Sequence, residues 1–307
     1  MKKVLFASTV AFVLLFNACK KDTVSTEEEL ALQVTSQTNA NDQARLQNDD
    51  DVFSNDAAQA IDTDAEFGTV PSKNVDSATI EGAVIDKRGL LNKKVVLSYW
   101  GKNINGVIKT GKITIELISG SKWRDAGAVI KQTFDTCSIT RNNKTIVFNG
   151  TRYVTNVKGG TFAGMYLKGD TIVHQVRVNG TVTFENGATK TWWAARRNTY
   201  FIKLLSLNFI SSGDTLINSE ACAMGGISRF GNAFVVKAPI DLKIVNTTTC
   251  VGKPQSGVRV FTSDNRTVTV TYGVDSQGNA VTSGCAYGYK VEWTKYNNAK
   301  GSAIIAY

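Results

Sequence analysis

The chain has 307 residues, of which 42% are hydrophobic and 20% are charged, and its formal net charge is +9. This composition suits a folded protein with one large β domain or two smaller domains, and it argues against wholesale disorder. The sequence contains 1 histidine. A histidine-based metal cage is therefore excluded, as is any mechanism that needs two histidines.

The first 18 residues have the pattern of a secretion signal. Lys2 and Lys3 give a positive start, and an apolar run follows from Val4 to Phe16. A membrane-spanning helix needs about 20 apolar residues, so this run is too short to cross a bilayer but suits the core of a signal peptide. No later segment approaches its apolar length, so we expect no transmembrane helix after residue 18.

The signal ends in Leu14–Cys19, with the sequence LLFNAC, which resembles a bacterial lipobox. In lipobox proteins the cysteine thiol receives a diacylglycerol, cleavage occurs before the cysteine, and its amine is then acylated. One acyl chain holds a protein only marginally, whereas several give a durable anchor. The resemblance implies that Cys19 is the lipid anchor. The alternative is an ordinary signal peptide with a chance cysteine.

Charge divides the rest of the chain in two. Residues 20–67 hold 12 acidic and 3 basic residues, residues 68–307 hold 14 acidic and 30 basic residues, and every glycine lies at or beyond Gly68. We therefore predict an acidic stalk over residues 19–67 and a basic body over residues 68–307, with room in the body for two sub-domains. The stalk's polar composition predicts a disordered tether, and the apolar spacing of Asp51–Ala65 predicts a short helix within it. Its opposite charge predicts that it lies against the body, held by an attraction that salt weakens.

The body has the pattern of an all-β fold. Ile113–Leu117 and Val268–Tyr272 alternate apolar and polar residues, which places the apolar groups on one face of a strand. Turn signals recur roughly every 8–14 residues. This spacing predicts an antiparallel meander that forms a sandwich or a long layered sheet. The predicted turns include Asn105–Gly106, Asn142–Asn143, Asn149–Gly150, Asn179–Gly180 and Asn186–Gly187.

Four cysteines follow Cys19, and an even number in an exported protein permits two disulfides. Cys250 and Cys285 flank two predicted strands and their hairpin, which favours a Cys250–Cys285 bond. Cys137–Cys222 is the second candidate pair, and buried free thiols are the alternative. No Cys-x-x-Cys pair is present, which argues against zinc. We expect no metal and no cofactor.

Constellations that could carry catalysis are scarce in the sequence. His174 lies in an alternating segment and is predicted to be a half-exposed strand residue. The sequence has no Gly-x-Ser-x-Gly nucleophile elbow. A carboxylate pair that cleaves polysaccharide would have to come from scattered acids. The candidates for such a pair are Glu116, Glu185, Glu220 and Glu292.

Two adjacent tryptophans provide the candidate ligand site. Trp192 and Trp193 precede Arg196 and Arg197, and neighbouring residues on a strand point to opposite faces, so one indole is expected to reach solvent. Aromatic faces beside basic and amide groups bind sugars or stack on bases. The alternative is that one tryptophan fills the core and the other caps the sheet. Because the chain is exported, a glycan or an anionic envelope polymer is favoured over nucleic acid as the partner of the basic body.

The body as a whole resembles a family of Bacteroidetes-type exported lipoproteins of unknown function. The resemblance rests on Asp50–Asp56, Gly111–Ile115, Phe148–Thr151, Val154–Asn156, Ser228–Phe234 and Thr269–Gly273. Many such lipoproteins are displayed on the outer face of the outer membrane, but the family brings no activity with it. The sequence thus predicts a lipid-anchored outer-membrane protein at the cell surface with a non-catalytic binding or structural role. A polysaccharide-acting enzyme is the alternative.

Overall fold

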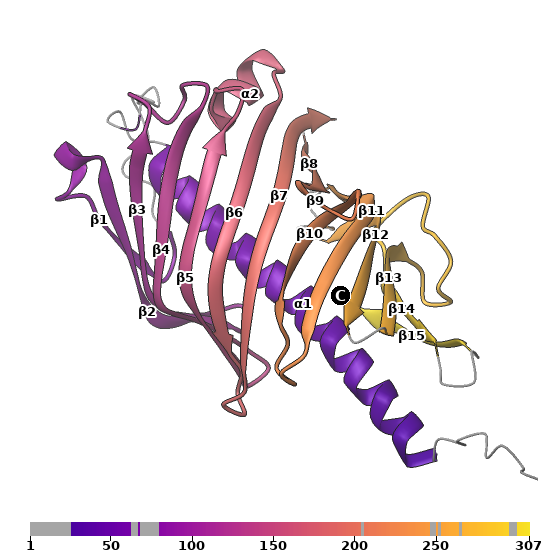
Figure 1. Ribbon diagram of the computed structural model, residues 1–307. Helices are drawn as coiled ribbons and strands as arrows, with labels where there is room; N and C mark the ends of the chain where they lie inside the picture. Colours follow the sequence, from indigo (N-terminus) through magenta and orange to yellow (C-terminus); the bar gives the residue numbers. More distant parts are fainter. Residues whose placement is uncertain are drawn as a thin grey trace, which may run out of the picture.

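The computed structural model describes residues 26–62, 67, 80–203, 206–245, 250, 253–263, 266–294 and 300–307. The signal segment and Cys19 lie outside these residues. Over the described ranges, one antiparallel sheet of fifteen strands curves around a long helix, α1 (Thr26–Asp62) (Figure 1). No helix in these ranges is both long and apolar enough to cross a membrane.

The strands are β1 (Ala83–Asp86), β2 (Lys94–Ile104), β3 (Val107–Ser119), β4 (Ala128–Arg141), β5 (Lys144–Asn156), β6 (Ile172–Thr183), β7 (Thr189–Lys203), β8 (Ser206–Gly213), β9 (Thr215–Ile217), β10 (Glu220–Ile227), β11 (Ala233–Val245), β12 (Pro254–Ser263), β13 (Arg266–Val274), β14 (Gly288–Thr294) and β15 (Lys300–Ala306). Two short helical elements, the 3-10 helix η1 (Leu90–Asn92) and the helix α2 (Phe162–Lys168), lie in the connections.

The order of the strands in the sheet largely follows their order in the chain. Strands β1 to β7 pair consecutively, and so do β10 to β15. Strand β8 pairs with the last part of β7 and of β11, while β10 pairs with their first part. The predicted antiparallel meander is therefore confirmed, in the form of one long curved sheet.

Turn signals in the sequence predicted some hairpins correctly and misplaced others. Asn105 and Gly106 have φ values of 51° and 80° and join β2 to β3, as expected of a two-residue hairpin loop. The predicted turn at Asn149–Gly150 is wrong, because β5 continues through it. A Cβ added to Gly150 would lie 2.3 Å from the carbonyl oxygen of Asn179 on β6. The glycine is needed for this close approach of two strands and not for a turn.

The predicted turn at Asn179–Gly180 is wrong for the same reason. Gly180 lies opposite Gly150 in the register of β5 and β6, and both strands run unbroken past the pair. A Cβ on Gly180 would lie 2.5 Å from the carbonyl oxygen of Asn149. The two glycines together let the strands approach each other in the middle of the sheet.

Helix α1 supplies the centre of the core. Figure 1 shows that it crosses the sheet diagonally, along the inner side of the curve. Its buried apolar side chains belong to one core cluster together with inward-facing residues of the sheet. Those helix residues are Leu46, Phe53, Ala57, Ala60 and Ile61. Because most helical stability in proteins comes from tertiary packing, a mostly polar segment can form a helix of this length only against such a surface.

The single helix of 37 residues, Thr26–Asp62, corrects the prediction of a disordered tether with only a short helix near residues 51–65. That prediction used apolar spacing alone, whereas the sheet also buries charged residues of α1. The predicted attraction between the acidic segment and the basic body is confirmed by ion pairs. Asp49 pairs with Arg141 at 3.0 Å, and Asp42 and Asp56 pair with Arg229 and Lys109. The predicted boundary at Gly68 lies outside the described residues.

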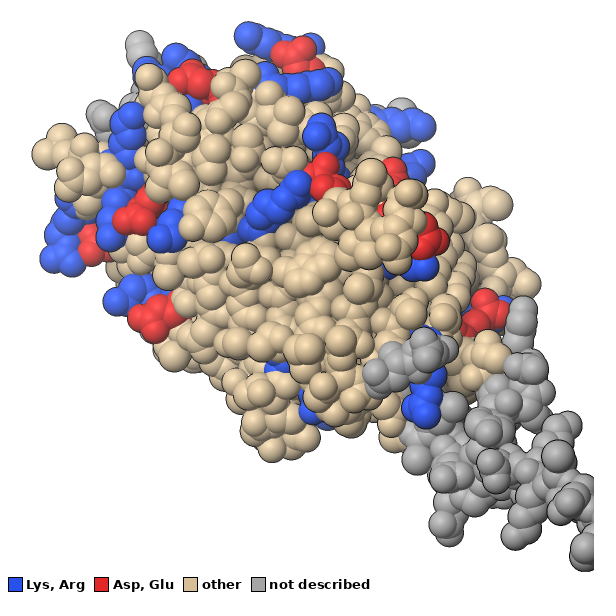
Figure 2. Space-filling model, viewed as in Figure 1, with Lys and Arg blue, Asp and Glu red and all other residues tan. Residues whose placement is uncertain are grey.

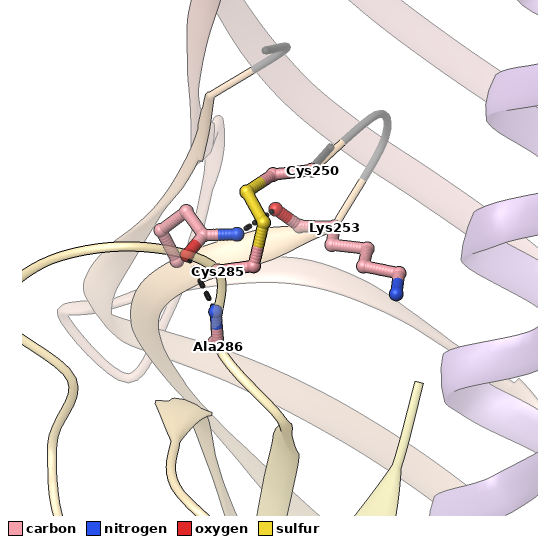
Figure 3. The surroundings of a disulfide bond; sticks show 5 residues. Cys250, Lys253, Cys285 and Ala286 are labelled. Carbon is pink, nitrogen blue, oxygen red and sulfur yellow. Dashed lines mark hydrogen bonds between the residues drawn. A yellow bond between two sulfur atoms is a disulfide. The ribbon is translucent and has the colours of Figure 1, made fainter. Parts of the chain in front are cut away.

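A disulfide joins Cys250, after β11, to Cys285, before β14, and confirms the favoured pairing. Their Cα atoms are 5.4 Å apart. In Figure 3, the backbone N–H of Ala286 donates to a side chain that in turn donates to the carbonyl of Lys253. This side chain is Gln255, with donor–acceptor distances of 2.9 Å and 3.0 Å. The disulfide and the glutamine together tie the β11–β12 connection to the β13–β14 connection.

Reduction of this disulfide should lower the free energy of unfolding by about 4 kcal/mol, because it releases a loop of 35 residues in the unfolded chain. Urea unfolding with and without dithiothreitol measures the difference. The matched control is the double variant Cys250→Ser/Cys285→Ser, in which the reductant should have no effect. In the denatured, unreduced protein, an alkylating reagent should modify two of the four cysteines that follow Cys19, namely Cys137 and Cys222. Modification of all four would contradict the disulfide.

Candidate functional site

The four residues of the predicted ligand site all lie on β7, and the alternation of the strand divides them between the two faces of the sheet. Trp192 and Arg196 point inward and are 5% and 2% exposed. Trp193 is half-buried and Arg197 is exposed, and both are on the outer side. The structure therefore does not bring the four side chains together, because residues two apart share a face and neighbours do not.

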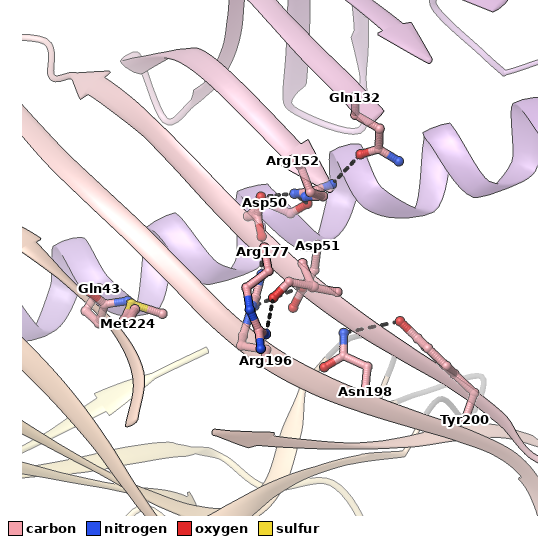
Figure 4. A network of polar contacts seen from close by, with 11 residues as sticks. Gln43, Asp50, Asp51, Gln132, Arg152, Arg177, Arg196, Asn198, Tyr200 and Met224 are labelled. Carbon is pink, nitrogen blue, oxygen red and sulfur yellow. Dashed lines mark hydrogen bonds and ion pairs between the residues drawn. The ribbon is translucent and has the colours of Figure 1, made fainter. Parts of the chain in front are cut away.

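The two inward residues are part of the contact between α1 and the sheet. Figure 4 shows Arg196 and Arg152 converging on Asp50 of α1 from β7 and β5. Arg152 also donates to Oε1 of Gln132 at 3.0 Å, and Arg196 lies 3.5 Å from Asp51. Arg196 is paired with Asp50 of α1 and Trp192 is buried in the core cluster, so neither is free to meet a ligand.

Burial governs the charges of this network. Burial raises the pKa of Asp51, while the nearby Arg196 lowers it to a smaller extent. Burial also lowers the pKa of the Arg152 guanidinium to about 9, so that it remains charged at neutral pH. Buried charges are tolerated when they are paired. The network thus fixes where α1 lies on the sheet. Its charged groups are paired with one another and stabilise the fold.

On the outer face, Arg197 and Arg177 both pair with Asp214, at 3.2 Å and 2.6 Å. Trp193 lies over a neighbouring strand. A Cβ added to Gly225 of β10 would lie 2.7 Å from Cζ2 and 2.8 Å from Cε2 of this indole. A larger residue at position 225 would clash with the indole, so Gly225 allows the ring of Trp193 to lie against the sheet. Of the four predicted residues, Trp193 is the one with both an aromatic surface and partial access to solvent.

Around Trp193, the outer face carries rows of small polar side chains that run across the strands. The register places Thr114, Thr133 and Thr151 side by side on β3, β4 and β5, and continues through Asn179 on β6 to Trp193. We call this set the upper row. A lower row consists of Asn149, Thr181 and Thr191 on β5, β6 and β7.

Charged residues are absent from both rows. In Figure 1 the middle strands pass in front of α1, so this view faces the outer side of the sheet. Figure 2, in the same view, shows a broad area without lysine, arginine, aspartate or glutamate, with charged side chains gathered around it. Sequence reasoning missed this surface. The threonines are visible in the sequence, but their alignment depends on the registers of four strand pairs.

The four candidate carboxylates are dispersed over the sheet. They lie on β3, in the β6–β7 turn, on β10 and on β14, and each has a basic neighbour. Glu116 is 3.1 Å from Lys94, and Glu292 is 2.8 Å from Lys290. The remaining two, Glu185 and Glu220, pair with Arg45 and Lys237. No two of these four carboxylates face each other as glycoside cleavage requires.

The second candidate disulfide is not formed. Cys137 on β4 and Cys222 on β10 are both buried free thiols. The sheet order places β5, β6 and β7 between the two strands, so the thiols are too far apart to bond. Burial raises the pKa of the Cys137 thiol to about 12. This cysteine is therefore a protonated core residue at neutral pH.

His174 on β6 is buried, at 6% exposure, which corrects the prediction of a half-exposed residue. Its ring lies in an aromatic cluster, 5.2 Å from Trp123, 5.9 Å from Phe162 and 5.3 Å from Tyr200 between ring centroids. Burial lowers its pKa to about 4. The imidazole is therefore neutral over the physiological range, and its ring contacts are aromatic.

Acidification should destabilise the protein through His174. The folded-state pKa of about 4 lies below the ordinary value of 6.5, so the stabilisation is complete above pH 6.5 and is lost as pH falls towards 4. The loss amounts to about 3 kcal/mol. Urea unfolding of the wild type and of His174→Gln at pH 7.5 and pH 4 measures it. The variant should lose less stability than the wild type over this interval, and equal losses would contradict the prediction.

Among the described residues, no group of three or more histidine, cysteine, aspartate and glutamate side chains is placed to hold a metal ion. Comparison with known proteins finds no matching family model, no matching curated protein and no matching solved structure. Fold and site together define a curved antiparallel sheet wound around a helix, with its inner face packed against that helix and two rows of uncharged polar residues on its outer face.

Proposed function

We propose that the chain is a lipoprotein anchored in the outer membrane through acyl groups on Cys19, with the β body at the cell surface in a non-catalytic binding role. The lipobox-like segment before Cys19 supports the anchor. The Cys250–Cys285 bond supports export, since disulfides form and persist in oxidising compartments.

The observation that carries the binding role is the difference between the two faces of the sheet. Over the described residues, the inner face is packed against α1 and its buried ion pairs. The outer face presents rows of hydroxyl and amide groups around Trp193. Because the four candidate carboxylates are apart from one another, a binding surface accounts for this geometry better than an acid–base pair does.

The length of α1 bears on how far the β body could lie from the proposed anchor. Six residues separate Cys19 from Thr26, where the helix begins. Six residues span at most about 20 Å, and a helix of 37 residues is about 55 Å long. Figure 1 shows the first part of the helix extending beyond the sheet. The helix that forms the core therefore also leads from the sheet towards the anchor.

The anchor and the surface location can be tested in the bacterium that produces the protein. Cells grown with radioactive palmitate should label the wild type, and Cys19→Ala should abolish the label. A membrane-impermeant amine reagent, applied to intact cells, should modify the lysines of the wild type. Absence of palmitate from the wild type would overturn the anchor, and modification only after cell lysis would overturn surface display.

A further inference from the structure

The outer face of the sheet has a regular chemical pattern. Neighbouring strands are about 4.8 Å apart, so Thr114, Thr133 and Thr151 present one hydroxyl per strand at this interval. Asn179 extends the upper row with an amide, and Trp193 closes it with an indole. Hydroxyl and amide groups both donate and accept hydrogen bonds. The row is therefore suited to a partner that also carries donors and acceptors at short regular intervals.

The position of Trp193 adds an apolar platform to the rows. Since only glycine at position 225 leaves room for the indole, the ring is held close against β10. A ring held in this way loses little conformational entropy on binding, because its orientation is already restricted. An indole face packs well against flat apolar surfaces, and its N–H provides a polar edge.

The absence of charge from the two rows indicates which class of partner they suit. The upper and lower rows contain no charged residue, whereas the row above them on the same face holds Glu116, Lys131 and Arg177. The body as a whole carries 30 lysine and arginine residues against 14 acids. An anionic polymer would be drawn to the basic residues outside the rows. A protein partner would favour an apolar, aromatic interface centre, whereas these rows consist mostly of threonine and asparagine. An uncharged polymer that is rich in hydroxyl groups matches the rows in both charge and hydrogen bonding.

We infer that the outer face over β3 to β7 binds an extended strand of a neutral polysaccharide, with Trp193 stacked on a sugar ring and the threonine and asparagine rows bonded to sugar hydroxyls. The inference rests on the proposed surface location and names the partner class. The face curves outward, so it fits a strand exposed on a fibre or gel. An enclosed short oligosaccharide would need a cavity.

Sedimentation of the purified mature lipoprotein, in detergent, with insoluble polysaccharides tests the inference. The panel contains cellulose, chitin, starch and a β-1,3-glucan as neutral polymers, and calcium alginate and calcium pectate as anionic ones. The wild type should bind at least one neutral polymer. Trp193→Ala should weaken that binding by about tenfold, as expected for the loss of one stacked aromatic ring.

Two further variants make the result decisive. Thr181→Lys places a charge in the lower row at an exposed position and should weaken binding by a similar factor. Trp100→Ala is the matched control, because Trp100 is 65% exposed on β2 and lies outside both rows. It should bind like the wild type. Urea unfolding verifies that each variant is folded.

Several outcomes would overturn the inference. They are binding to anionic polymers alone, binding to none of the panel, and equal weakening by Trp193→Ala and Trp100→Ala. Self-association of the wild type that Trp193→Ala abolishes, without polysaccharide binding, would assign the face to a second copy of the chain. None of these outcomes alters palmitate labelling or surface modification, so they leave the proposed anchor and location intact.

Discussion

Replacing Asp50 with alanine should lower the free energy of unfolding by about 3–5 kcal/mol, because it leaves the buried Arg152 without a carboxylate and the buried Arg196 with Asp51 alone. Arg152 and Arg196 are 0% and 2% exposed, and both pair with Asp50. The total stability of a folded domain is about 5–15 kcal/mol, so this loss is a large share of it. Urea unfolding, followed by tryptophan fluorescence, measures the change.

The matched control for Asp50→Ala is Glu81→Ala. Glu81 pairs with Lys102 at 2.7 Å, and both side chains are exposed to solvent. Its removal should cost less than about 1 kcal/mol. A double variant, Asp50→Leu/Arg152→Met, should be more stable than Asp50→Ala, because it removes the unpaired charge of Arg152 and keeps the pairing of Arg196 with Asp51. If Asp50→Ala and Glu81→Ala unfold at the same urea concentration, the buried network does not hold α1 in the sheet.

Replacing Phe53 with alanine should cost about 3–5 kcal/mol through the cavity that it creates. Phe53 is 0% exposed, and its ring centroid lies 5.7 Å from that of Tyr99, 5.9 Å from Phe134 and 5.6 Å from Phe148. These partners come from β2, β4 and β5, so one helix side chain joins three strands. Urea unfolding at neutral pH measures the loss.

The control for Phe53→Ala is Leu91→Ala, since Leu91 is 95% exposed and has no packing to lose. It should change the free energy of unfolding by less than about 0.5 kcal/mol. Phe53→Leu should have an intermediate effect, because it retains part of the buried volume. A loss below about 1 kcal/mol for Phe53→Ala would mean that the aromatic cluster does not join α1 to the sheet.

The all-β fold and the antiparallel order could be predicted because they depend on local signals. Alternating residues such as Ile113–Leu117 and hairpin turns such as Asn105–Gly106 act over a few positions. The same signals failed at Asn149–Gly150 and Asn179–Gly180. An Asn-Gly pair supplies a small residue as well as a positive φ, and only the neighbouring strand decides which property is used.

The place of α1 could be predicted only in part. Opposite charges indicated contact between the acidic segment and the basic body, and the ion pairs confirm it. The depth of burial was not visible, because Asp49 and Asp50 are typical surface residues by type. Their partners, Arg141, Arg152 and Arg196, are about 90 or more positions away in the chain. Burial of such groups therefore depends on long-range structure.

The candidate site, too, could be predicted only where it depends on local sequence signals. Strand alternation predicted that Trp192 and Trp193 point to opposite faces, but not which face α1 covers. The rows around Trp193 require the registers of β3 to β7, which no local pattern specifies. The favoured disulfide was predictable because Cys250 and Cys285 flank one local pair of strands, which keeps their ends together.

Hydrogen exchange of the α1 amides tests most directly whether this helix is the core of the sheet. In the purified mature protein, the amides of residues 46–61 should exchange as slowly as those of β4 to β7, because they open only when the whole sheet unfolds. In Asp50→Ala both sets should exchange faster, by the same factor. Rapid exchange of residues 46–61 while the strands remain protected would show that α1 is detachable, and would contradict the structure described above.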